Sequence, residues 1–127
     1  MPEMLASALR QNKDEAMRIK KGTYRIAYSD GWKSEKGSYC HCYPFIIHRQ
    51  ADEKYWKVSH MATGYNIKRR LTLKLAKELV TKIKDYPIFL MPTIEAWNQQ
   101  MAWMKENKPA TWQMLTHIIT TIGDNRK

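Results

Sequence analysis

The spacing of the apolar residues changes along this chain, and the order of the changes limits the folds open to it. Over residues 3–20 apolar residues recur every three or four positions, as on one face of an amphipathic helix. Between residues 23 and 69 short runs alternate apolar and polar residues, which is typical of half-buried strands. From Thr72 onward the helical spacing returns.

Turn signals divide the middle of the chain into short strands. Asp30-Gly31 and Thr63-Gly64 are typical turn pairs, and residues 51–53 make a polar break. Pro44 lacks an N–H group, so its strand is expected at a sheet edge or at a bulge. The strands are predicted at residues 23–28, 39–49, 54–60 and, as a short fourth, 65–69, with an exposed loop over 32–38.

Three helices are predicted after the strands. Thr72 and Thr93 are suitable N-caps, Pro109 suits the first turn of a last helix, and Gly123 suits its end. The sequence therefore predicts an α+β fold with an N-terminal helix, an antiparallel sheet of three or four strands, and three C-terminal helices. It predicts one domain over residues 1–127, with a sheet-containing part at about 22–70 and a helical part at about 72–122.

The positive charge is segregated. The net charge is +10; residues 54–84 carry nine basic residues against one acidic residue, whereas residues 85–127 carry four of each. Separation of one sign creates a field that attracts polyanions. The alternative is a solvated basic face that has no partner.

Aromatic residues are interleaved with the cations, which favours nucleic acid as the polyanion. Rings stack on bases, cations neutralise phosphates, and a helix start such as that after residues 68–70 also favours phosphate. The alternative is that the rings belong to the core and the cations to a solvated turn. Tyr65 is expected to be exposed. The predicted nucleic-acid-binding residues are Arg25, Lys33, Lys54, Lys57, Tyr65, Lys68, Arg69, Arg70 and Lys74.

One stretch resembles a known family. Residues 55–83, YWKVSHMATGYNIKRRLTLKLAKELVTKI, resemble the N-terminal arm-type DNA-binding domains of phage integrases. The resemblance is carried by Trp56, Gly64, Ile67, Arg69, Thr72 and Ala76. It implies a three-stranded sheet packed on one helix, with the sheet in the major groove and Lys57, Lys68 and Arg70 near DNA. It does not cover the helices after Pro87.

Catalytic and metal-binding motifs are weak. On a strand, Cys40 and Cys42 face one way and His41 the other, so a zinc site would need His48, His60 or His117 to complete it. The sequence holds no Gly-rich phosphate loop, no HExxH and no GxSxG motif. We therefore predict no enzyme activity, no catalytic residue, no metal and no cofactor.

The C-terminal Trp and Met residues suggest a second binding surface. Trp97 and Met101 are predicted to be buried and Trp103 exposed, and Met-rich apolar surface suits a protein partner. The region from Trp97 to Trp112 is thus a candidate for docking a protein or a second copy of the chain.

The function predicted from the sequence is that of a non-enzymatic nucleic-acid-binding accessory protein, with DNA favoured over RNA and a phage or mobile-element origin. The alternative is a protein-interaction module or inhibitor whose basic face docks an acidic protein surface. No apolar run approaches the roughly 20 residues that a bilayer needs, and the first residues lack the pattern of a signal peptide. No membrane association and a cytoplasmic location are therefore expected.

Overall fold

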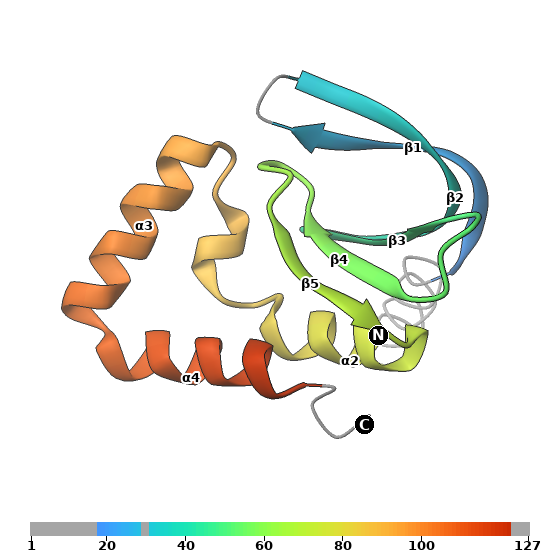
Figure 1. Ribbon diagram of the computed structural model, residues 1–127. Coiled ribbons are helices and arrows are strands. Elements are labelled where there is room, and N and C mark those ends of the chain that lie inside the picture. Colours follow the sequence, from blue (N-terminus) through green and yellow to red (C-terminus); the bar gives the residue numbers. More distant parts are fainter. Residues whose placement is uncertain (1–17, 29–30, 123–127) are drawn as a thin grey trace, which may run out of the picture.

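The computed structural model describes residues 18–28 and 31–122 (Figure 1). The strands are β1 (Lys20–Tyr28), β2 (Gly31–Cys42), β3 (Phe45–Gln50), β4 (Trp56–His60) and β5 (Asn66–Leu71). The helices are α2 (Leu73–Ile83), the 3₁₀ helix η1 (Pro87–Leu90), α3 (Ile94–Asn107) and α4 (Pro109–Thr121).

Within the described residues the sheet has five antiparallel strands in the order β1-β2-β3-β4-β5, so the prediction of three or four strands was wrong. Strand β2 is also longer than predicted. Residues 32–38, predicted as an exposed loop, belong to it and pair with β1. The Tyr24 hydroxyl donates to Glu35, and the Gln50 amide donates to the same carboxylate. These contacts across three strands hold a polar segment in a sheet that its own composition does not favour.

The strand predicted over residues 39–49 is two strands. Tyr43 and Pro44, joined by a cis peptide bond, form the turn between β2 and β3. Proline cannot donate a hydrogen bond to a neighbouring strand, so Pro44 lies in the turn. The pairing of β2 with β3 begins beside this turn, with Cys42 opposite Phe45.

The prediction of an N-terminal helix over residues 3–20 was wrong for residues 18–20. Arg18 and Ile19 have no regular structure, and Lys20 already belongs to β1. Pairing of Lys20 with Tyr39 of β2 overrides the weak helical spacing at this point. The rest of that prediction, residues 3–17, lies outside the described residues.

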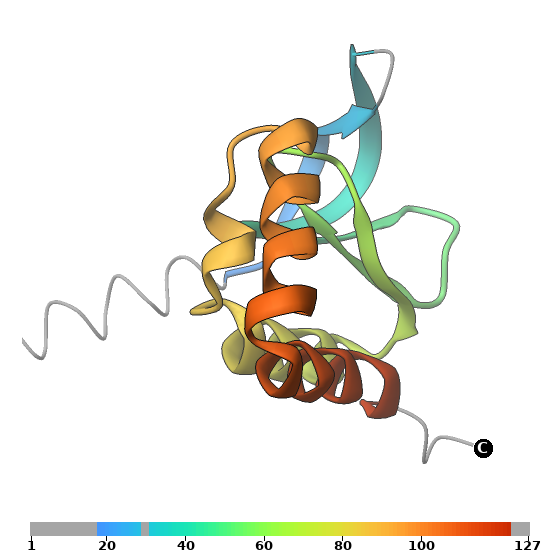
Figure 2. The ribbon, with the colours of Figure 1, turned by 90° about the vertical axis from the view of Figure 1, so that its left-hand side faces the viewer.

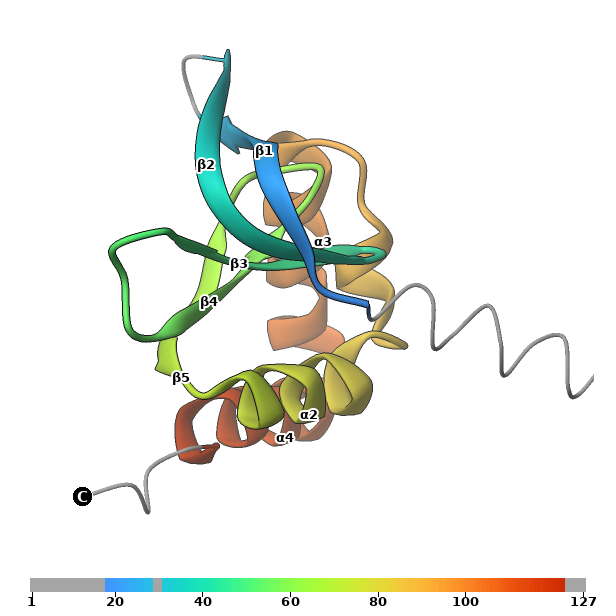
Figure 3. The ribbon, with the colours of Figure 1, turned by 90° about the vertical axis from the view of Figure 1, so that its right-hand side faces the viewer.

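Three α-helices follow the sheet, as predicted. Thr72 caps α2 by accepting a hydrogen bond from the Leu75 N–H, and Thr93 caps α3 in the same way. Figures 2 and 3 show the helices gathered against one side of the sheet, with α4 beside α2 and α3. No helix of the described ranges has the length and apolar character needed to cross a bilayer.

The main core lies between the sheet and the helices. Its sheet side includes Phe45, Ile47 and Val58, and its helix side includes Leu79 and Phe89, all nearly inaccessible to solvent. Burial of these apolar side chains is the principal force that holds the helical part against the sheet.

A second, smaller core lies on the other face of the sheet. Tyr24 and Ile26 of β1 pack with Ile46 of β3, although β2 separates those two strands in the sheet. Contact between strands that are not hydrogen-bonded neighbours means that the sheet curls, so the face away from the helices is concave. Figures 1 and 3 show β1 and β2 arching over this face.

Candidate nucleic-acid interface

The pairing of β4 with β5 is irregular, and the irregularity places three cations together. The register is Trp56 with Leu71, Val58 with Lys68 and Ser59 with Asn66. On β4 only Lys57 stands between the first two pairs, whereas on β5 both Arg69 and Arg70 do. Two residues opposite one make a β-bulge. Arg70 has a φ of 63°, in the left-handed region that non-glycine residues rarely adopt.

Around this bulge lie two hollows that share Lys57 and Arg69, and we call them together the basic groove. One hollow, of about 270 Å³, is lined by Glu53, Lys54, Tyr55, Lys57, Arg69 and Arg70. The other, of about 240 Å³, is lined by Ile26, His48, Lys57, Ser59, Gly64, Asn66 and Arg69 and lies on the concave face. Four of the nine predicted binding residues therefore meet in one place.

The charge of the basic groove is largely uncompensated. Glu53 lies 3.1 Å from the Lys57 ammonium and is the one acid among the described residues that line the groove. Within the described part of the chain, the exposed side chains of Arg69 and Arg70 make no hydrogen bond or ion pair. Like charges facing each other on paired strands oppose folding. Packing alone does not require three cations at a strained bulge, whereas a site that binds an anion does.

A buried polar pair forms part of the concave hollow. His48 Nε2 lies 2.8 Å from the Ser59 hydroxyl, and both residues are nearly inaccessible. Burial, with the nearby Lys57 charge, lowers the pKa of His48 to about 4, so the ring is neutral near pH 7. Its Nδ1 atom is buried without a hydrogen-bond partner among the described residues.

Two residues predicted to bind nucleic acid make contacts with the helical part of the protein. Tyr65, expected to be exposed, is half-buried, because its ring packs on the main core and lies edge-on against Trp97 at 5.3 Å. Lys68 also points to the helices, where its ammonium donates to the carbonyl oxygens of Ile119 and Thr120 at 2.7 and 2.9 Å. The extra β5 residue Ile67 causes this orientation of Lys68.

The other three predicted residues are exposed but lie outside the basic groove. The Arg25 guanidinium on β1 lies 5.2 Å from the centre of the Trp32 ring, and Lys33 stands on β2 opposite Ile26. Lys74 is in the first turn of α2. The structure does not gather these residues with the other four.

Cys40 and Cys42 face the core on the same side, as predicted. Their sulfur atoms lie 3.1 Å apart, and the hydrogen bond to Cys40 together with burial raises the pKa of the Cys42 thiol far above its usual range. The same contact lowers the pKa of the Cys40 thiol. His41 is exposed on the opposite face, and the described residues contain no group of three or more potential ligands placed to hold a metal.

The C-terminal aromatic residues follow the prediction in part. Trp97 is 8% exposed and Trp103 is 49% exposed, as expected, whereas Met101 is only half-buried.

Sequence reasoning did not find His48, Ser59 and Asn66 as groove residues. His48 and Ser59 are eleven positions apart and meet only because β3 and β4 pair. A buried polar pair of this kind becomes visible only once the strand register is known.

The chain matches none of the protein-family models, none of the curated proteins and none of the solved structures with which it was compared. The stretch that resembles arm-type integrase domains contains β4, β5 and α2. What that resemblance implies about DNA stays a prediction.

Proposed function

We propose that this protein binds nucleic acid through the basic groove and catalyses no reaction of its own. The observation that carries the proposal is the β4–β5 bulge, which presents Arg69 and Arg70 opposite Lys57 with little neutralising charge. Exposed arginines of this kind bind phosphate through two parallel hydrogen bonds. Tyr55, 38% exposed at the same hollow, adds a ring on which a base can stack.

DNA is the nucleic acid that we favour, and a phage or mobile-element accessory role in the cytoplasm is the setting that we favour. The support for DNA is the resemblance of residues 55–83 to arm-type integrase domains, of which the groove uses Lys57, Arg69 and Arg70. An acidic protein surface is the alternative ligand, because carboxylates also bind arginine. Phosphates along a nucleic-acid strand and carboxylates on a protein surface are spaced differently. Direct binding measurements with each kind of ligand therefore distinguish the two.

The test is fluorescence anisotropy with labelled single-stranded DNA, duplex DNA and RNA of one sequence, over a range of salt. If Lys54, Lys57, Arg69 and Arg70 each contact a phosphate, the logarithm of the association constant should fall with the logarithm of salt at a slope of about −3 to −4. The double variant Arg69→Glu, Arg70→Glu should bind on the order of a hundredfold more weakly and with a smaller slope.

The matched control is Lys82→Glu with Lys108→Glu, which changes the net charge equally at two exposed positions, the last turn of α2 and the junction between α3 and α4. This control should bind nearly as the unmodified protein does. Equal weakening by both double variants, or binding that ignores salt, would mean that the basic groove is not a phosphate site.

A further inference from the structure

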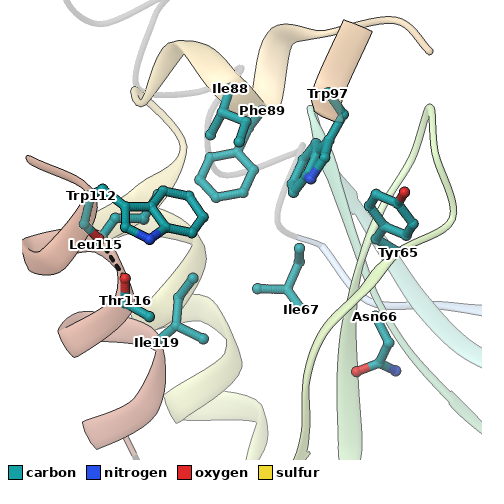
Figure 4. Close-up of a pocket in the computed structure, with 10 residues that line it drawn as sticks. All are labelled: Tyr65, Asn66, Ile67, Ile88, Phe89, Trp97, Trp112, Leu115, Thr116 and Ile119. Atoms are coloured by element: carbon teal, nitrogen blue, oxygen red, sulfur yellow. Dashed lines mark hydrogen bonds between the residues drawn. The ribbon is translucent and has the colours of Figure 1, made fainter. Parts of the chain in front are cut away.

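An apolar cavity lies on the other side of β5 from the basic groove. It has a volume of about 250 Å³ and opens between β5, α3 and α4 (Figure 4). Its walls are Tyr65, Ile67, Ile88, Phe89, Trp97, Trp112, Leu115 and Ile119, with Asn66 and Thr116 as polar members. Four of its walls are aromatic rings, and Figure 4 shows Phe89, Trp97 and Trp112 around the same space.

The walls of this cavity are fixed by the core. Phe89 lies with its ring centre 5.4 Å from that of Trp97, and both residues are buried. The Lys105 ammonium lies over the Trp112 ring, 5.4 Å from the ring centre. A space bounded by packed side chains of this kind is preformed, so a ligand that enters it need not order its walls.

The size and chemistry of the cavity suit a single flat ring system. Ligand pockets for drug-sized molecules span roughly 300 to 1,000 Å³, so this cavity falls just below that range. Aromatic walls favour a flat ring that can stack or meet them edge-on. Asn66 makes no side-chain hydrogen bond within the described residues, and its amide can both donate and accept, which matches the edge of an adenine base.

The cavity and the basic groove lie on opposite sides of β5 and share one lining residue. Asn66 lines this cavity and also the hollow that contains Lys57 and Arg69. A phosphate held at the groove therefore places the rest of its nucleotide beside the edge strand β5, next to the cavity. The cations of the basic groove suit a phosphate, and the aromatic walls of the cavity suit a base. Both therefore point to a nucleotide as the ligand.

We infer that the cavity receives one unstacked base of a nucleic acid whose phosphates occupy the basic groove. This inference rests on the proposed function and specifies its ligand as a strand with at least one base free of its duplex partner. Such a base would lie among Phe89, Trp97 and Trp112, with its polar edge at Asn66.

The first test compares an intact labelled DNA single strand with the same strand made abasic, which keeps every phosphate. The unmodified protein should bind the abasic strand about tenfold more weakly. Ile119→Trp, which fills the cavity, should lose most of the difference between the two strands, and what remains is stacking on Tyr55 outside the cavity. Thr121→Trp, exposed on the same helix and outside the cavity, should behave like the unmodified protein.

These outcomes separate the two proposals. If the unmodified protein binds neither strand, the proposed function fails. If it binds both equally, with affinity that falls as salt rises, the basic groove stands and the base cavity is overturned.

The second test needs no variant, so it holds even if Ile119→Trp does not fold. Adding adenosine 5′-monophosphate to ¹⁵N-labelled protein should shift the indole N–H resonances of Trp97 and Trp112 but not that of exposed Trp103. Ribose 5-phosphate, which lacks the base, should leave all three unchanged. Shifts of Trp97 and Trp112 on dilution of the protein alone would instead show that a second copy fills the cavity, and would overturn the inference.

Discussion

His48 is a titratable residue that the fold removes from water, and this has a consequence for stability. Its ring lies under the concave face against Tyr24, at 5.3 Å between ring centres, with Nε2 bonded to Ser59. Burial with the nearby Lys57 charge lowers its pKa to about 4, whereas an unperturbed histidine titrates near 6.5. Between those values the unfolded chain binds a proton at this position and the folded chain does not.

We therefore predict that the free energy of unfolding falls by about 3 kcal/mol as the pH falls from 7 to 4, through His48 alone. Urea denaturation at several pH values measures this change. His48→Gln should flatten the pH dependence but not abolish it, because burial also lowers the pKa of His60. An exposed control, His117→Gln, should keep the full dependence; an equally steep profile in both variants would contradict the prediction.

At the scale of elements, Lys68 joins β5 to the end of α4. The last carbonyl groups of a helix have no partner within it, and positive charge there is favoured by the helix dipole. The Lys68 ammonium supplies both the hydrogen bonds and the charge, to Ile119 and Thr120.

Lys68→Met should accordingly lower the free energy of unfolding by about 1–2 kcal/mol, since it removes two charge-assisted hydrogen bonds. The same change at exposed Lys74 should have little effect, and thermal denaturation compares the two. For the folded protein at low temperature, Lys68→Met should leave nucleic-acid affinity within about twofold. A large loss of affinity with unchanged stability would return Lys68 to the binding surface.

The elements also differ in how well the sequence predicts them. Helix α2 was predictable because Thr72 and the apolar stripe of Leu79, Val80 and Ile83 are local signals. The N-terminal part of β2 was not, because only pairing with β1 and the contacts of Glu35 make it a strand. The excess of basic residues over 54–84 can be counted in the sequence, but the irregular pairing that turns Arg69 to the groove and Lys68 to the helices depends on strand register.

At the scale of the whole molecule, Phe89 connects the sheet to the helices. Its ring centre lies 4.8 Å from that of Phe45 on β3 and 5.4 Å from that of Trp97 on α3, and it is 2% exposed. The two parts should therefore unfold together rather than in sequence.

Phe89→Ala should destabilise the protein by about 3–5 kcal/mol, because it leaves a cavity where both parts meet. The milder Phe89→Leu should cost about 1 kcal/mol. In urea, the circular dichroism of the helices and the fluorescence of the tryptophans should give one midpoint, shifted equally in each variant. Two separate midpoints in the unmodified protein would show that the parts fold independently.

Among the described residues, the open strand order leaves β1 and β5 with one unpaired edge each, and an unpaired edge can pair with another chain. Both edges carry cations, Lys20 and Lys21 on β1 and Arg69 and Arg70 on β5. Two copies that approach edge to edge bring these charges together and repel each other. Added salt weakens this repulsion as well as phosphate binding. At the β5 edge, protection against pairing with another copy and affinity for a polyanion therefore depend on the same two side chains, Arg69 and Arg70, and respond to the same change in solution.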